Sequence, residues 1–170
     1  RKPGAPGALA DMDCDSAIAD SPDEVRMRVR EQLMRGAAHI KLTAGGGVSS
    51  PHSPLDVVTF TPAELRAATE AAGNWGTYVT VHAYTADAIR QAIESGVKVI
   101  EHGSLMDDET ARLMQGKGIW LSIQPFPDAM ADAFPPGSFE RQKAEGVFAG
   151  NHNAYTLAKK YRLKTAWGTD

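Results

Sequence analysis

Four side chains that can bind a metal lie at or near the ends of predicted β-strands: Lys41, His82, His102 and Asp170. Neutral imidazole and carboxylate groups are ligands for zinc and similar divalent metals. Taken singly, each has an ordinary explanation, because a strand-end histidine is commonly structural and an aspartate after Gly-Thr commonly belongs to a turn. A lysine within an apolar strand is less ordinary, since lysine is rarely buried unless paired. Their joint occurrence favours a metal centre.

Groups that can hold a substrate stand beside these positions. Tyr84 follows His82 by two residues, so the two share a strand face, and the tyrosine hydroxyl can donate to a developing oxyanion or hold a carboxylate. An amphipathic aromatic at a strand end is the ordinary alternative. Gln124 follows the fourth predicted strand, and a glycine-rich loop after Lys41 is expected to line the pocket with backbone amides. The expected substrate-binding set is Gly46, Gly47, Val48, Tyr84 and Gln124.

Alternating helix and strand patterns must position these groups. Capping-box sequences, SPDE at 21–24 and TPAE at 61–64, begin two of the helices. The strands are predicted at about 38–43, 77–82, 97–101, 119–123 and 163–168, with helices between them. Residues 126–139 are expected to form a long irregular loop, part of a candidate lid at 125–137. The alternation predicts an α/β fold of parallel strands joined by right-handed crossovers.

Two architectures fit this pattern, a doubly wound open sheet and a piece of a (β/α)8 barrel. A complete barrel takes roughly 250 residues, whereas this chain has 170 residues. We therefore expect a single segment over residues 1–170, with a loop or arm at 1–20 and βα units at 21–170.

Composition and charge limit which partners the chain is expected to bind and where in the cell it is expected to lie. The net charge is −3 and basic residues form no stripe, so neither nucleic acid nor a membrane is an expected partner. The single cysteine, Cys14, excludes an intramolecular disulfide and a cysteine-rich zinc site. No signal peptide opens the chain, which predicts a cytoplasmic protein. Because the chain begins at Arg1, an upstream signal and a secreted or periplasmic location stay open.

Four motifs, IKLTAGGGVSSP, VHAYT, VIEHGS and WGTD, occur in an order that resembles the metal-dependent amidohydrolase superfamily. The resemblance is greatest to its imidazolonepropionase-like branch, with prolidase-type (Xaa-Pro) and arginine- or lysine-selective dipeptidases. It extends from about residue 22 to residue 170. It implies a TIM barrel of which this chain is about strands 4 to 8, without strands 1 to 3 and the flanking small β domain.

The resemblance also implies a binuclear metal site, usually zinc, although such donors also accept manganese, cobalt or iron. Lys41 would be carboxylated and bridge the metals, His82 and His102 would bind the more exposed metal, and Asp170 would bind the buried metal and move the proton. A metal-bridging hydroxide would then cleave the amide bond of a dipeptide or an N-acyl amino acid.

Several alternatives remain open. The chain has no His-x-His motif, so alone it is expected to lack two ligands of the buried metal and to be inactive or weakly metal-binding. A homo-oligomer or a complementing chain segment would then complete it. A cyclic-amide hydrolase, a Schiff-base lyase or aldolase using Lys41, and a non-catalytic assembly fragment are the other functions considered. Bound zinc would oppose the Schiff-base function, and borohydride trapping on Lys41 would support it.

Overall fold

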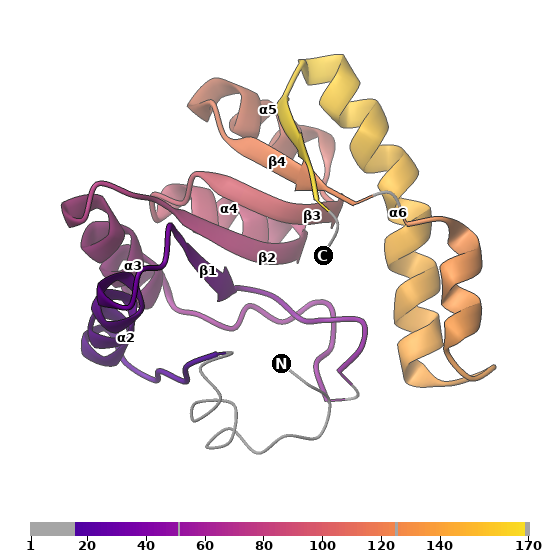
Figure 1. Cartoon of the computed structure of the whole chain (residues 1–170). Coiled ribbons are helices and arrows are strands. Elements are labelled where there is room, and N and C mark those ends of the chain that lie inside the picture. Colours follow the sequence, from indigo (N-terminus) through magenta and orange to yellow (C-terminus); the bar gives the residue numbers. More distant parts are fainter. Residues whose placement is uncertain (1–15, 51, 125, 169–170) are drawn as a thin grey trace.

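The computed structural model describes residues 16–50, 52–124 and 126–168. Its sheet has five parallel strands that follow one another in chain order (Figure 1). A doubly wound sheet reverses its strand order at a switch point, whereas a barrel wall does not. The sequential order therefore agrees with a barrel segment and confirms the predicted α/β alternation. The strands are β1 (Ile40–Thr43), β2 (Val79–Thr85), β3 (Val99–Leu105), β4 (Trp120–Ile123) and β5 (Lys164–Trp167).

The helices supply the apolar layer that covers one face of this sheet. Strand residues such as Val81, Ile100 and Leu121 are buried in one core cluster with helix residues such as Leu65 and Ile89. Burying an aliphatic side chain of this size contributes roughly 1.5–3 kcal/mol. Because strand side chains alternate, the opposite face is left for polar residues. The helices are α2 (Pro22–Met34), α3 (Pro62–Asn74), α4 (Ala86–Glu94), α5 (Asp108–Lys117), α6 (Phe139–Tyr161) and the short 3-10 helix η1 (Asp128–Ala133).

The two predicted capping boxes differ in the structure. At the start of α3, Thr61 accepts from the Glu64 amide and the Glu64 carboxylate accepts from the Thr61 amide, so the box is complete. At the start of α2, Ser21 accepts from the Glu24 amide as predicted. The Glu24 carboxylate instead accepts from the amide of Asp20, at 2.7 Å. The prediction is therefore confirmed for α3 and only half right for α2.

The segment predicted to be irregular, residues 126–139, contains η1 and gives its last residue to α6. Phe126 packs against Phe148 of α6, with ring centroids 5.3 Å apart, so apolar contact holds the segment on the helix. Helix α6 runs without a break through Gly146 and Gly150. A Cβ at Gly150 would lie 2.5 Å from the Ser104 carbonyl oxygen, so glycine lets α6 pack directly on β3.

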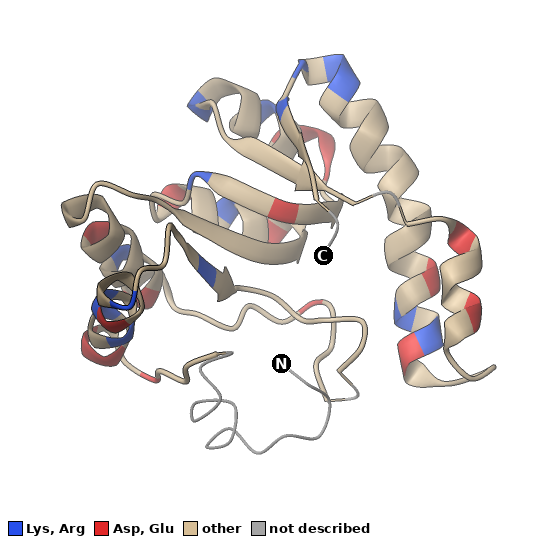
Figure 2. Cartoon of the chain, in the orientation of Figure 1, with Lys and Arg blue, Asp and Glu red and all other residues tan. Residues whose placement is uncertain are grey.

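Charged side chains of both signs are interspersed on the outer helices, as Figure 2 shows for α2 and α6. Among the helices that the structure describes, none is both long and apolar enough to cross a bilayer.

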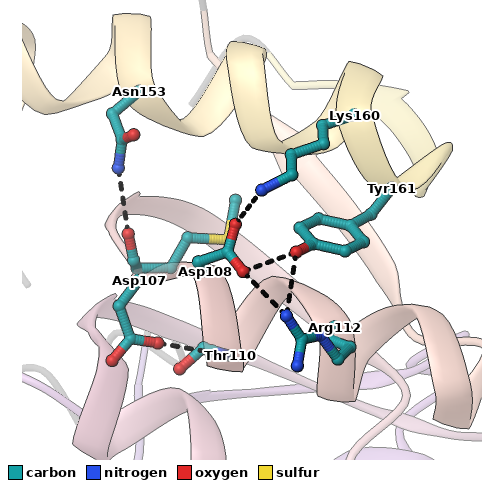
Figure 3. Close-up of polar contacts among 8 residues, drawn as sticks. Asp107, Asp108, Thr110, Arg112, Asn153, Lys160 and Tyr161 are labelled. Atoms are coloured by element: carbon teal, nitrogen blue, oxygen red, sulfur yellow. Dashed lines mark hydrogen bonds and ion pairs between the residues drawn. The ribbon is translucent and has the colours of Figure 1, made fainter.

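A carboxylate ties α5 to α6 (Figure 3). Asp108 of α5 accepts hydrogen bonds from the Lys160 ammonium and the Tyr161 hydroxyl, both on α6. Arg112, one turn further along α5, pairs with the same carboxylate at 3.2 Å. The hydrogen bond from Lys160, followed by that from Tyr161, lowers the pKa of Asp108 below its ordinary value. The contact fixes the end of α6 that leads into β5.

Asp107, which caps α5, gives a testable pH dependence. Its carboxylate accepts from the Thr110 amide at 2.8 Å and pairs with Arg90 at 2.9 Å. Hydrogen bonding to the Thr110 side chain, with the contribution of Arg90, lowers the pKa of Asp107 from 3.8 to about 2. The variant Asp107→Ala should lose about 1 kcal/mol of stability near neutral pH, as is usual when a cap is removed.

The direction of the Asp107 pKa shift determines how the stability difference between the variant and the parent should change with pH. A lowered carboxyl pKa stabilises the folded state above the unfolded pKa, and the effect disappears as pH falls from about 3.8 towards about 2. Urea unfolding of both proteins should therefore show a stability difference that shrinks through this acid range. Glu109→Ala, at an exposed acid in the same first turn, is the matched control. A difference independent of pH would contradict the assignment.

Candidate active site on β2 and β3

Three rings form a contact cluster on two neighbouring strands, where His82 is the fourth and Tyr84 the sixth residue of β2 and His102 is the fourth residue of β3. The His82 and His102 ring centroids are 4.5 Å apart, with the ring planes at 74°. Tyr84 lies 4.8 Å from the His82 ring and 4.9 Å from the His102 ring. His102 is 2% exposed and Tyr84 is 5% exposed, whereas His82 is half-buried. The structure thus brings together three of the residues that the sequence singled out.

An irregular backbone turns His102 towards His82. The strand register pairs His82 with Glu101, so in a regular strand the next residue, His102, would point to the other face. His102 has φ 74° and Gly103 has φ 65°, and the pairing of β2 with β3 shifts just beyond Ala83. A left-handed backbone costs roughly 1–2 kcal/mol at a residue with a side chain. The fold accepts this strain where it brings the two imidazoles side by side.

A hydrogen bond to the loop after β1 orients the His82 ring. His82 Nε2 lies 2.8 Å from the carbonyl oxygen of Gly46. A carbonyl oxygen only accepts, so Nε2 carries the proton and the lone pair of a neutral ring is on Nδ1. Such a bond to a backbone carbonyl is the usual way in which a metal-binding histidine is fixed.

Lys41 is placed by the strand register. Lys41 pairs with Thr80, and Thr43 pairs with His82, so Lys41 lies on the same face as His82 and two residues earlier. Two residues along a strand correspond to roughly 6–7 Å, a distance that a lysine side chain spans. Lys41 is exposed, because β1 is an outer strand of the described sheet.

Apart from Tyr84, the expected substrate-binding residues divide into two groups. Gln124 is 3% exposed at the end of β4, and a Cβ on Gly168 would lie 2.6 Å from its Nε2. The side chain of Gln124 therefore packs against the backbone that leads to Asp170. Asp170 itself lies outside the described residues, so its assignment stays a prediction.

The second group lies in the glycine loop, which we define as residues 45–50 and 52–53. The carbonyl of Gly46 accepts from His82, and the amide of Gly47 donates to Ser53 Oγ at 3.1 Å. Val48 packs against the apolar cluster that contains Tyr84. The Gly47 amide, expected to face substrate, thus has a partner inside the loop.

Sequence reasoning missed Lys143 of α6, which is 5% exposed. Its ammonium donates to the carbonyls of Gly47 and Ser50 in the glycine loop. A signal was present, because Lys143 has the helical spacing of Val147 and the other buried residues of α6.

The donor chemistry fits part of a metal site. In residues 16–50, 52–124 and 126–168, no three His, Cys, Asp or Glu side chains gather as a metal-binding group. The described part contributes two imidazoles from adjacent strands, with the rings in contact. Imidazole is a common zinc ligand, and the orienting bond of His82 to Gly46 supports this role.

Residues 4–146 match the profile of the Amidohydrolase family. The chain belongs to the amidohydrolase family. This family is generally metal-dependent, which agrees with a pair of histidines in contact on adjacent strands. A curated relative, ochratoxinase of Aspergillus niger, is 41% identical over 159 residues, which are 90% of this chain and 32% of that protein.

Solved structures agree with the amidohydrolase assignment. A crystal structure described as an amidohydrolase has a TM-score of 0.85 and 40% identity, over 91% of this chain and 38% of that one. A prolidase crystallised with N-methylphosphonate-L-proline has a TM-score of 0.85 and 33% identity, over 91% of this chain and 39% of that one. The chain thus spans about a third of its curated relative and forms part of a TIM barrel.

Proposed function

We propose that this amidohydrolase chain provides the second half of a metal-dependent barrel that hydrolyses amide bonds in dipeptides or N-acyl amino acids. The observation that carries the proposal is the contact between His82 and His102 on adjacent strands, with Tyr84 against both rings. Ochratoxinase and a prolidase are among the similar proteins, which supports amide substrates.

In this proposal each residue has a defined task. His82, His102, carboxylated Lys41 and Asp170 would together hold a binuclear divalent-metal centre. A bound divalent metal, zinc by preference, polarises the amide carbonyl and lowers the pKa of water. Asp170 moves the proton to the leaving amine, while Tyr84 donates to the carbonyl oxygen or holds the substrate carboxylate. Gly46, Gly47, Val48 and Gln124 shape the substrate pocket.

A second candidate is a chain that acts only after assembly with further strands, from a homo-oligomer or a complementing segment. The favouring observation is the exposure of the outer strands, since Lys41 of β1 and Trp167 of β5 face solvent and Trp167 is 69% exposed. An exposed strand edge invites pairing with another chain.

One experiment tests both candidates. The 170-residue chain and the protein that carries it are each purified, analysed for bound metal, and assayed on Xaa-Pro dipeptides, N-acyl amino acids and a cyclic amide. We expect metal-dependent release of the amine from the first two classes by the longer protein. Turnover of only the cyclic amide would contradict the dipeptide and N-acyl amino acid substrates and favour a cyclic-amide hydrolase. Borohydride trapping of a substrate on Lys41 without bound metal would overturn the proposal. Full turnover by the short chain would exclude the need for assembly.

A further inference from the structure

Lys143 is a buried cation whose ammonium donates to three backbone carbonyls. Its ammonium donates to Gly47 at 2.7 Å, to Ser50 at 2.6 Å and to Ser53 at 3.1 Å. The side chain is 5% exposed, and its ammonium also lies 4.8 Å from the centre of the Phe139 ring. An aromatic face and three carbonyl oxygens form a cradle for a compact cation.

The cradle joins segments far apart in the sequence, because the three carbonyls precede Lys143 by 90 to 96 residues. Burial lowers the pKa of Lys143, and the nearby Glu140 carboxylate acts in the opposite direction. A desolvated ammonium is costly unless its hydrogen bonds are made. The three hydrogen bonds to the glycine loop therefore offset the cost of burying this ammonium.

The held loop leads directly to the histidine pair. Gly47, whose carbonyl binds Lys143, is bonded to Gly46, whose carbonyl accepts from His82 Nε2 at 2.8 Å. The Gly47 amide also donates to Ser53 Oγ, and Ser53 in turn gives its carbonyl to Lys143. The ammonium thus holds the peptide group that directly follows the Gly46 carbonyl, and that carbonyl sets the His82 tautomer.

We propose that Lys143 is a positioning residue that locks the glycine loop and, through the Gly46 carbonyl, holds the His82 ring in the orientation needed to bind metal. The metal-binding part rests on the proposed function, whereas the locking of the loop and of the ring does not. Lys143 acts from helix α6, outside the strand-end motifs, and touches neither histidine in this chain of contacts.

Two variants of the protein that carries this chain test the proposal. Lys143→Met keeps the length of the apolar stem and removes the charge, so it suits the buried face of α6. Lys143→Ala removes the side chain that fills the cradle. Added n-propylammonium can restore both the missing stem and its positive charge, whereas neutral 1-propanol can restore only the stem. Lys159→Ala, at an exposed lysine on the same helix, is the matched control.

The decisive measurements are made on metal-free protein. In Lys143→Met, hydrogen exchange of the Gly47 amide should rise at least about tenfold, and the 15N shifts of the His82 ring should show a mixture of tautomers. In Lys143→Ala, n-propylammonium should reverse both changes more than 1-propanol does. Unchanged exchange and an unchanged His82 tautomer would overturn the proposal. Equal rescue by the alcohol, or exchange raised equally throughout the protein, would reduce Lys143 to a packing role and also overturn it.

Metal titration then separates this inference from the proposed function. Cobalt(II) affinity of Lys143→Met should fall about 10- to 100-fold, as for loss of a group that orients a ligand. Loop and tautomer changes without any effect on a measurable cobalt affinity would refute the link to metal binding. If the parent protein binds no divalent metal, the proposed function and the metal-binding part of this inference both fail, while the loop readouts still decide the locking part.

Discussion

Replacing His102 with asparagine is expected to weaken divalent-metal binding by the protein that carries this chain by at least about a hundredfold. Loss of a group that merely orients a ligand costs 10- to 100-fold, so loss of the ligand itself should cost no less. In the proposed function amide hydrolysis should fall with it, because a bound metal would supply both carbonyl polarisation and an activated water. Metal content and cobalt(II) titration measure the first effect, and turnover of a dipeptide measures the second.

Asparagine is chosen because of the backbone at position 102. The residue has φ 74°, a conformation that asparagine tolerates better than most residues with a side chain. The variant thereby removes the imidazole with little added strain. His39→Asn is the matched control, because His39 is exposed and stacks on Tyr78 away from the ring cluster. If His102→Asn retains metal and turnover at the parent's level, His102 is not a ligand.

The second large effect is expected from Gly46→Ala. A Cβ at Gly46 would lie 1.7 Å from the carbonyl oxygen of Pro54 and 2.5 Å from its carbonyl carbon. Both atoms belong to the backbone, so no flexible side chain can move to relieve the clash and the glycine loop itself has to shift. We expect a loss of about 2–3 kcal/mol in the free energy of unfolding. The displaced Gly46 carbonyl should also release the His82 ring, with a fall in metal affinity.

The neighbouring glycine provides the control. A Cβ at Gly47 would have nothing within 4 Å, so Gly47→Ala should change stability by less than about 0.5 kcal/mol. Urea unfolding of both variants compares the two positions directly, and His82 ring 15N shifts follow the histidine. Equal stability of the two variants would show that the loop does not approach Pro54 as closely as described.

The parts of the fold that local chemistry controls were predictable. Thr61 and Glu64 satisfy each other's backbone groups within one helical turn, so the start of α3 could be read from the sequence. The alternation of strands and helices likewise predicted parallel pairing, which the structure shows. The half-formed box at Ser21 was missed because the Glu24 carboxylate had a competing amide, that of Asp20, within reach.

The site was predictable in composition and not in geometry. His82 and Tyr84 share a strand face by simple alternation, and their ring contact agrees with it. His102 reaches them only through a left-handed backbone, which residue types and spacing do not reveal. Lys143 was missed because its partners are carbonyls, which every residue possesses, at a separation of 90 residues or more. Such contacts do not change the local pattern of apolar residues. The only local signal is that Lys143 has the helical spacing of the buried residues of α6.

The strictly sequential strand order has a consequence for how the chain acquires its structure. Each strand pairs with its successor, so a newly made strand docks on an edge that already exists and is never inserted between two paired strands. Each closure spans about one βα unit, so the strand pairings are more local in sequence than in a sheet whose strand order reverses. During synthesis, β1 and β2 can therefore pair before α6 leaves the ribosome. Lys143 of α6 is made 90 to 96 residues after its carbonyl partners, so the glycine loop gains this contact only late in synthesis.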